Sequence, residues 1–361
     1  MEPALLAKYY TDALGFLQTL IAIPSFSKEE DKTADAIGLF LQAQGIDTMR
    51  KGNNVWATNK YFDTNKPTIL LNSHHDTVKP NASYTRNSFK PVIENGKLYG
   101  LGSNDAGGAL VALAATFFHF DNIKNLPFNL IYAATAEEEI SGKGGIESIL
   151  AELGEIHLAI VGEPTLMKIA VAERGLLVID CTAEGVAGHA ARNEGENAIY
   201  KAMKDIEWFR TFQFEKASEW LGPVSMNATI IQAGTTHNTV PAECKFTVDI
   251  RLNECYTHQA VLEIIRKNIT SKVAERSTRI KPSFIDIDHP FVGIAKNMNI
   301  ELYGSPTTSD QALLTCPSIK LGPGDSARSH TADEFIYVQE IENGIATYIQ
   351  LLATYANQLK A

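Results

Sequence analysis

Cysteine is scarce in this sequence, and its spacing excludes two classes of small fold. The chain of 361 residues has four cysteines, none of which forms a CxxC pair: Cys181, Cys244, Cys255 and Cys316. Neither a disulfide framework nor a zinc-finger spacing is therefore indicated. We expect the thiols to be inert packing groups in a reducing cytoplasm.

Positive charge and long apolar runs are also lacking. The chain has 32 Lys and Arg against 42 Asp and Glu, a formal net charge of −10, which would repel a nucleic-acid backbone. The most apolar stretch, residues 107–120, contains His119 and is shorter than the roughly 18 residues of a membrane span. Glu2 stands where a secretion signal would be basic. We expect a cytoplasmic protein with no nucleic-acid or membrane partner.

Helical and strand patterns alternate in the first half of the chain. Apolar residues recur with a helical period over about 3–22, 33–44, 106–120 and 144–153. Short apolar runs typical of strands lie between these helices, at 55–58, 68–72, 129–134 and 157–161. This alternation predicts an α/β domain with a mixed or parallel sheet covered by helices.

A different pattern occupies residues 173–281. Its predicted elements are a strand at 176–182, a helix at 196–212, a strand at 245–251, a helix at 256–269 and a last strand near 279–284. With one further strand between the helices, the order is β-α-β-β-α-β, which is typical of a ferredoxin-like α+β domain. We predict that this domain is inserted into a discontinuous larger domain of residues 1–172 and 282–361.

Acidic and histidine residues follow the ends of the predicted strands. These are His74 and Asp76 after the strand at 68–72, Glu137, Glu138 and Glu139 after the strand at 129–134, and Glu163 after the strand at 157–161. Asp105 precedes a predicted helix, and His330 follows another strand candidate at 318–321. Ligands of open α/β sheets collect outside the carboxyl ends of the strands. We therefore expect these residues to converge at one edge of the sheet.

Several carboxylates in one crevice would repel one another unless a cation balanced their charge. Taken singly, each residue could be a helix cap or a surface group, so the joint placement carries the prediction. Two histidines and three carboxylates suit a pair of zinc ions. The glycines Gly100 and Gly102 do not form a dinucleotide fingerprint, because Asp105 stands at the third glycine position.

The sequence resembles the co-catalytic zinc aminoacylase and peptidase family that includes acetylornithine deacetylase, succinyl-diaminopimelate desuccinylase and the glutamate-releasing carboxypeptidases. The resemblance covers essentially the whole chain. It depends on six segments in this order: SHHDTV, GLGSNDAGG, TAEEE, VGEPT, GHAAR and GPGDSARSHTADE. It implies a zinc-peptidase-like catalytic domain with a central mixed sheet flanked by helices, and an inserted domain that serves as a lid and forms a homodimer.

The resemblance also implies the metal ligands. His74 and Glu163 would be the terminal ligands of one Zn²⁺, Glu139 and His330 those of the other, and Asp105 would bridge the two ions. Co²⁺ could substitute for zinc.

Other residues receive roles from the same resemblance. Asp76 would accept the second ring N–H of His74, and Glu138 would be the general base that moves a proton from the attacking water to the leaving amine. The peptide bond between Asp105 and Ala106 would be cis. His189 would stabilise the oxyanion at a neighbouring subunit's site.

Asn238 and Arg251 match positions that hold the substrate's carboxylate or carbonyl in relatives. Arg174 is a further candidate that could instead be a surface ion pair. The sequence departs from many relatives at Glu137, where an Asp is usual, and at residues 106–108, where Ala-Gly-Gly replaces Met-Lys or a similar pair.

We predict hydrolysis of an N-acyl-L-amino acid in arginine biosynthesis, with N-acetyl-ornithine or a related N-acetyl or N-succinyl derivative of ornithine or citrulline as substrate. A succinyl group would need an additional cation, for which Arg328 and Arg192 are candidates. One alternative is a zinc di- or tripeptidase of the same family. Another is a non-catalytic protein that binds zinc or an amino acid, which the intact ligand set and Glu138 argue against.

Overall fold

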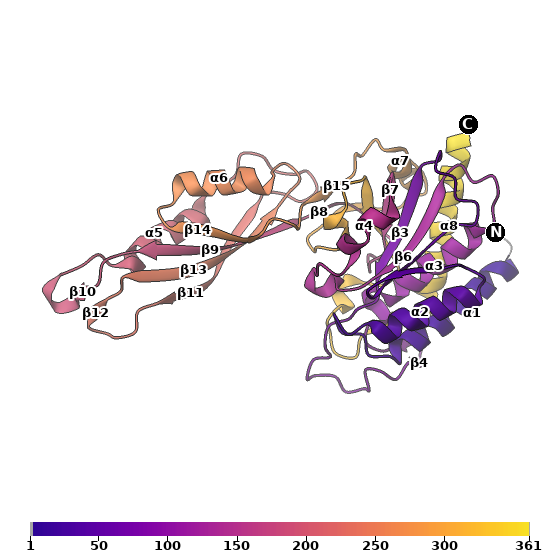
Figure 1. Ribbon diagram of the computed structural model, residues 1–361, viewed down its shortest axis with the longest axis horizontal. Helices are drawn as coiled ribbons and strands as arrows, with labels where there is room; N and C mark the ends of the chain where they lie inside the picture. Colours follow the sequence, from indigo (N-terminus) through magenta and orange to yellow (C-terminus); the bar gives the residue numbers. More distant parts are fainter. Residues whose placement is uncertain (1–2, 361) are drawn as a thin grey trace. The chain divides into compact units, whose positions relative to one another are not determined.

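The structure, a computed structural model, describes residues 3–360 and consists of two compact units (Figure 1). The first unit comprises the chain as far as Val171, Phe284–Tyr303 and the chain from Ser309 onward. The second unit comprises Ala172–Ser283 together with Gly304–Thr308. The sequence pattern had assigned this last segment to the larger domain. In this segment the Ser305 carbonyl accepts a hydrogen bond from the backbone N–H of Arg174 at 3.3 Å.

The first unit is built on a mixed sheet of nine strands. Eight of them follow the order β1 (Met49–Lys51), β2 (Asn54–Thr58), β6 (Asn129–Thr135), β3 (Thr68–His74), β7 (Leu158–Val161), β17 (Ser318–Lys320), β8 (Ile169–Glu173) and β15 (Ser283–Phe284), and β16 (Leu302–Ser305) pairs with β8. Strand β3 pairs in parallel with both β6 and β7, whereas β2 runs antiparallel to β6. Every residue of β3, β6 and β7 is buried, as expected for strands covered on both faces. The predicted mixed sheet is confirmed.

Helices cover this sheet on both faces (Figure 1). The helices of the first unit are α1 (Pro3–Ile21), α2 (Asp31–Ala43), α3 (Gly108–Asp121), α4 (Leu150–Leu153), α7 (Pro290–Asn297) and α8 (Val338–Lys360). Helix α3 is buried nearly all round because it lies between strands β3 and β6 and the helices α1 and α8. The predicted helix at 144–153 is wrong in extent: only a 3-10 turn, Ile146–Ser148, and the short α4 form there.

The second unit is a four-stranded antiparallel sheet with two helices. The sheet order is β11 (Ser225–Ala233), β13 (Glu243–Leu252), β9 (Gly175–Glu184) and β14 (Lys272–Ser277), and the helices are α5 (Ala198–Thr211) and α6 (His258–Asn268). The chain order matches the predicted β-α-β-β-α-β pattern. The predicted last strand near 279–284 is wrong for this sheet. Its last strand is β14, a mostly exposed and polar edge segment with little apolar alternation, and within the predicted range only β15 (Ser283–Phe284) forms, which belongs to the nine-stranded sheet.

Alternation of apolar residues in β13 places one of its faces in the core of the second unit. Phe246, Val248 and Ile250 are buried there with residues of β9, α5 and α6. The ring of Phe246 lies edge-on to Phe209 of α5, with the ring centroids 6.1 Å apart.

Among the described residues, no helix has both the length and the apolar character that crossing a bilayer requires.

We expect Phe246→Ala to destabilise the second unit by about 3 to 5 kcal/mol, because it removes a buried ring and leaves a cavity. Chemical unfolding followed by the fluorescence of Trp208 and Trp220, which both lie in this unit, measures the change. The exposed neighbour Lys245 supplies the control variant, Lys245→Ala. Equal midpoints for the two variants would contradict this assignment of the core.

Candidate metal centre

Four chemically active side chains lie at the carboxyl ends of three neighbouring parallel strands. His74 is the last residue of β3, and Glu138 and Glu139 begin the 3-10 turn η2 (Glu138–Ile140), which follows β6. Glu163 follows the end of β7. Because β3 pairs in parallel with β6 and β7, these chain segments leave the sheet at the same edge. The structure thus brings together residues that are distant in the sequence.

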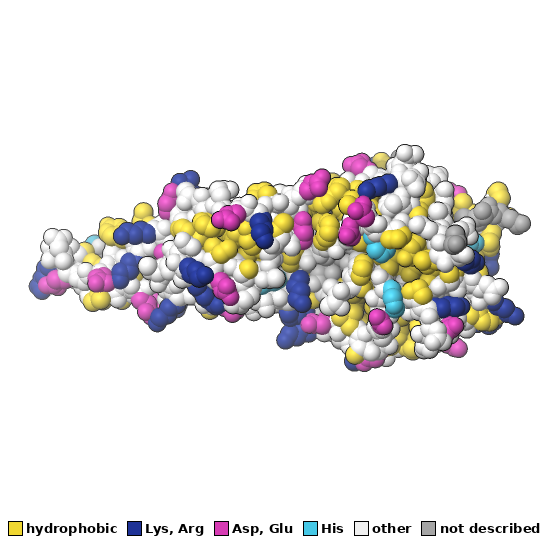
Figure 2. All heavy atoms as spheres, turned by 90° about the horizontal axis from the view of Figure 1, so that it is seen from above, with side chains coloured by type: hydrophobic (Ala, Val, Ile, Leu, Met, Phe, Trp, Pro, Cys, Tyr) yellow, Lys and Arg dark blue, Asp and Glu magenta, His cyan; other side chains and the backbone are white. Residues whose placement is uncertain are grey.

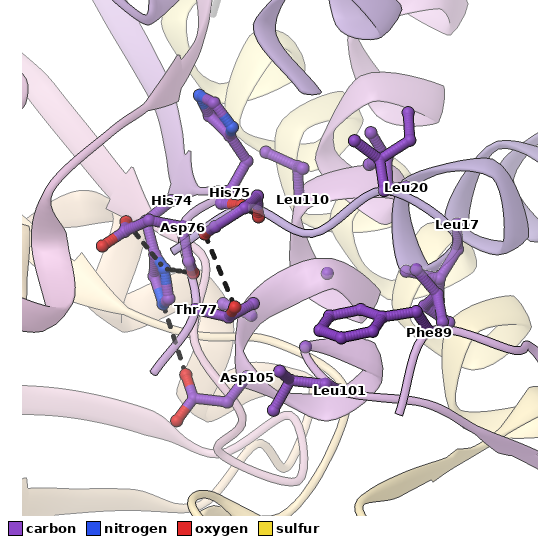
Figure 3. A pocket seen from close by; sticks show the side chains of 16 residues that line it. Leu17, Leu20, His74, His75, Asp76, Thr77, Phe89, Leu101, Asp105 and Leu110 are labelled. Carbon is purple, nitrogen blue, oxygen red and sulfur yellow. Dashed lines mark hydrogen bonds and ion pairs between the residues drawn. The ribbon is translucent and has the colours of Figure 1, made fainter. Parts of the chain in front are cut away.

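His74 faces the carboxylates through one ring nitrogen and its own loop through the other. Its Nε2 lies 3.2 Å from Asp105 Oδ1 and 3.8 Å from Glu163 Oε1. Its Nδ1 lies 2.9 Å from the backbone carbonyl of Asp76 and 3.4 Å from Asp76 Oδ1. Nδ1 therefore donates its hydrogen toward Asp76, and Nε2 is the ring nitrogen that faces the space among the carboxylates (Figure 3).

The Asp76 carboxylate also holds the turn that carries Glu138 and Glu139. It accepts hydrogen bonds from the backbone N–H groups of these two residues, at 3.0 and 3.2 Å, and from the Ser27 hydroxyl at 2.7 Å. Asp76 is fully buried. Its position two residues after His74 therefore joins the end of β3 to the turn after β6.

The neighbouring His75 points away from the carboxylates (Figure 3). Its Nε2 donates to the Asn53 carbonyl at 2.9 Å, so its Nδ1 accepts from the Thr33 hydroxyl at 2.9 Å. Burial lowers the pKa of His75 to about 4. The geometry therefore distinguishes two adjacent histidines: His74 faces the site, and His75 connects the end of β3 to the structure behind it.

His330 and Asp105 complete the cluster from outside these three strands. His330 Nε2 lies 2.9 Å from Glu139 Oε2 and 3.6 Å from Asp105 Oδ2. Asp105 lies in the single π-turn η1 (Ser103–Gly107), and its peptide bond to Ala106 is cis, as the resemblance implies. Its two carboxylate oxygens face different histidines, Oδ1 toward His74 and Oδ2 toward His330, which is the placement that a ligand shared by two ions needs.

The ligand atoms of this cluster and the crowding of its carboxylates are those expected of a site that binds cations. Ligand atoms of His74, Glu138 and Glu163 lie within 4.8 Å of one another, as do those of His74, Asp105 and Glu139. Burial, together with the neighbouring carboxylates, holds the pKa of Glu138 well above its usual range, although His74 opposes the shift. Carboxylates crowded in this way bind protons or cations, and a mixture of imidazole and carboxylate suits a transition metal.

Two buried acids beside the cluster were missed by the sequence reasoning. Glu334 accepts hydrogen bonds from the backbone of the Asp105 loop, and burial together with the charge of Asp105 raises its pKa to about 8. Asp310 accepts a hydrogen bond from the Thr135 hydroxyl at the end of β6, at 2.7 Å. Glu334 belongs to the SHTADE segment, so the motif contained a signal that was not used. The partner of Asp310 is far away in the sequence, and no local pattern indicates it.

In the second unit, a short ladder brings His189 and Asn238 together. Strand β10 (Gly188–His189) pairs with β12 (Thr239–Val240), and the Ala190 N–H donates to the Asn238 carbonyl at 3.1 Å. His189 is exposed, and its Nδ1 accepts the Ala191 N–H at 3.2 Å. The neutral ring therefore carries its hydrogen on Nε2, where it can be donated to a ligand.

Four arginines considered for substrate binding have partners. Arg251 donates from Nε and Nη2 to the two carboxylate oxygens of Asp249 at 2.8 and 3.0 Å. Arg174 donates to the carbonyl of Leu221 and, at 3.0 Å, to that of Pro223, which favours a structural role in that turn. The other two form ion pairs within their own units: Arg328 with Glu340 at 2.7 and 2.8 Å, and the exposed Arg192 with Glu194 at 4.0 Å.

Comparison of the chain with known proteins identifies the family model that it matches and several relatives. The model of peptidase family M20/M25/M40 matches residues 70–354. A succinyl-diaminopimelate desuccinylase 2 of Ruegeria sp. is 25% identical, covering 97% of this chain and 96% of the relative. A [LysW]-lysine/[LysW]-ornithine hydrolase of Saccharolobus solfataricus is 30% identical over 78% of this chain and 79% of its own.

Solved structures share the fold. A tripeptidase from Staphylococcus aureus superposes with a TM-score of 0.75 at 18% identity, covering 96% of this chain and 99% of its own. A dinuclear metal-binding peptidase of the M20 family from Bacillus subtilis gives a TM-score of 0.73 at 14% identity, covering 97% of this chain and 99% of its own.

We expect His74→Ala to lose bound metal and His75→Gln to retain it, because of these two adjacent residues His74 alone directs a ring nitrogen toward the carboxylates. Metal content after dialysis, measured by mass spectrometry, distinguishes the two variants. His75→Gln should show a lower melting temperature because its buried hydrogen bonds change. The assignment is refuted if His75→Gln loses the metal and His74→Ala keeps it.

Proposed function

The chain belongs to peptidase family M20/M25/M40, and we propose that its metal centre hydrolyses the amide bond of an N-acyl-L-amino acid. The products are a carboxylate and the free amino acid. The observation that carries the proposal is the cluster of His74, Asp105, Glu139, Glu163 and His330, whose donor atoms converge at one edge of the sheet.

We assign these five residues as ligands of two Zn²⁺ ions. His74 and Glu163 would hold one ion, Glu139 and His330 would hold the other, and Asp105 would be common to both. Bound zinc polarises a scissile carbonyl and lowers the pKa of water enough for attack at neutral pH. Co²⁺ suits the same imidazole and carboxylate donors.

Glu138 is the proposed general base. Its side chain lies with His74 and Glu163 in one group of potential ligand atoms, while its backbone N–H is fixed by the Asp76 carboxylate. From there Glu138 takes a proton from the attacking water and passes it to the leaving amine. Asp76 is a positioning residue in this scheme, because it fixes both the ring of His74 and the turn that carries Glu138.

The charge of the first unit favours a cationic amino acid and an uncharged acyl group. The second unit has equal numbers of acidic and basic residues, so the whole formal net charge of −10 belongs to the first unit. The three arginines of the first unit are all paired with carboxylates: Arg50 with Asp35, Arg86 with Glu94 and Arg328 with Glu340. None of them is left free to bind a succinyl carboxylate. We therefore propose N-acetyl-ornithine, with the uncharged N-acetyl-citrulline as the alternative, in arginine biosynthesis, ahead of the N-succinyl analogues.

Residues of the second unit enter the proposal through the family resemblance. We assign His189 to stabilisation of the oxyanion through its Nε2–H, and Asn238 and Arg251 to binding of the substrate's carboxylate or carbonyl. Arg174 remains a weaker candidate, because its guanidinium group is bound to backbone carbonyls. The four cysteines are free, in keeping with the proposed cytoplasmic location.

We also propose that the second unit forms a homodimer. Strand β11 is at one end of its sheet and exposes Ile230 and Ile231 at 49% and 55%. Helix α5 contacts β11 and exposes Tyr200 and Met203. Figure 2 shows charged side chains of both signs scattered over the viewed face, with hydrophobic side chains between them. An unpaired strand edge beside apolar side chains can pair with another chain.

Glu138→Gln should lower kcat by roughly 100-fold or more, because the proton can no longer be transferred, while metal content stays unchanged. The neighbouring variant Glu137→Gln is the matched control: that side chain accepts the Gly144 N–H and should retain most of the activity. Undiminished turnover by Glu138→Gln would contradict the assignment of the base.

Acetyl and succinyl derivatives of ornithine, citrulline and diaminopimelate, together with several dipeptides, test the substrate. We expect chelator-sensitive hydrolysis concentrated in the N-acetyl-ornithine and N-acetyl-citrulline reactions. Preference for N-succinyl-diaminopimelate would place the chain with the desuccinylase relative, and cleavage of dipeptides alone would favour the peptidase alternative. Absence of any turnover by zinc-loaded protein would favour a binding protein.

Ile231→Glu combined with Met203→Glu should convert the dimer to a monomer, because two charges would be buried in the interface. Light scattering after size exclusion measures the mass. Leu39→Glu is the control, since Leu39 is an exposed apolar residue of the first unit. A wild-type protein that is monomeric at every concentration would refute the proposal.

A further inference from the structure

A buried carboxylate holds the loop that carries Asp105. Glu334, only 2% exposed, accepts hydrogen bonds from the backbone N–H groups of Gly102 at 3.1 Å, Asn104 at 2.8 Å and Asp105 at 3.0 Å. All three donors come from one short stretch of chain that curves around the carboxylate. Such a concave arrangement of N–H groups binds an anionic oxygen.

A second contact joins the same two chain segments. The Asn104 side chain accepts the Asp325 N–H at 2.9 Å and donates to the Asp325 carbonyl at 3.0 Å. The segment from Asp325 to Glu334 includes His330. Two sets of hydrogen bonds therefore connect the loop of Asp105 to the segment of His330.

Asp105 and His330 need such a connection because neither belongs to the parallel strands that place the other ligands. His74 ends a fully buried strand. By contrast, His330 lies outside the named strands and helices with a φ of 59°, and its side chain is 54% exposed. Its distance to Asp105 depends on how well the two loops are fixed to each other.

We propose that Glu334 is a positioning residue that fixes the Asp105 carboxylate between His74 and His330 and so determines the affinity for the metal ion on the His330 side. This inference rests on the proposed metal centre. A side chain with two oxygen acceptors is required, because Oε1 accepts from Asn104 and Asp105 and Oε2 accepts from Gly102. In a glutamine, the NH₂ group would face N–H donors and leave at least one of them without an acceptor.

The test compares Glu334→Gln with Glu334→Asp and with the control Glu340→Gln. Glu340 lies a few residues further along the chain and accepts hydrogen bonds from Arg328 and from the Tyr337 N–H, both outside the Asp105 loop. Hydrogen exchange of the metal-free protein is followed for the peptide spanning residues 101–107. Metal titration then measures how many ions bind and how tightly.

In Glu334→Gln we expect exchange of this peptide to accelerate by about tenfold or more, because the N–H groups lose their acceptor. One of the two ions should bind about tenfold or more weakly, as is usual when a residue supporting a metal ligand is removed. The other ion and the KM measured at saturating metal should change little. Glu334→Asp keeps both oxygen acceptors and should fall between wild type and Glu334→Gln, and Glu340→Gln should leave exchange and metal affinity unchanged.

Wild-type exchange and wild-type affinity for both ions in Glu334→Gln would overturn the proposal, as would equal weakening of both ions with a general loss of stability. If Glu334→Gln does not fold, Glu334→Asp decides the question by the same two measurements. A wild-type protein that binds no metal would instead refute the proposed function, so the two failures are distinguishable.

Discussion

The parallel pairing of β3 with β6 and β7 determines where the ligands of the metal centre can lie. In this register His74 pairs with Thr135, and Asn72 pairs with both Ala133 and Val161, so the three strands end at nearly the same level. Residues that follow them must meet at one edge of the sheet. A slip of one residue in β3 would turn His74 to the opposite face, and no adjustment of the loops would restore its contact with Asp105 and Glu163.

Around this edge, side chains whose partners are far away in the sequence fix the ligand loops. Asp76 holds the turn of Glu138 and Glu139, and the Glu30 carboxylate accepts the Glu137 N–H at 3.2 Å. The departure at Glu137 also has a structural explanation. Its carboxylate lies against Gly142 and Gly144, where any Cβ atom would overlap it. The two glycines thus leave the room that the Glu137 side chain needs.

The sequence predicted those parts of the protein whose signals are local. Strands β3, β6 and β7 are continuous apolar runs, and the residues that follow them are visible as short motifs, so the cluster could be anticipated. Strand β14 was misplaced because an exposed edge strand has no buried face to impose alternation on its residues. The roles of Glu334 and Asn104 were missed because their partners lie more than two hundred positions away, and a buried acid has the same appearance in a sequence as an exposed one. The resemblance assigned His74 rather than His75 as the ligand, and the structure shows that of these two adjacent rings it is His74 that faces the carboxylates.

The unequal distribution of charge between the two units affects how fast a cation reaches the metal centre, whereas the buried ligands determine how slowly it leaves. Since the first unit carries the entire net charge, its field raises the local concentration of divalent ions and cationic solutes over a range of about 8 Å at physiological ionic strength. That long-range attraction affects how fast ions arrive and weakens as salt is added. The buried ligands act at contact distance, where salt has little influence, and they govern how slowly an ion leaves. A rise in ionic strength would therefore slow reloading of a stripped centre while leaving a loaded one nearly unchanged.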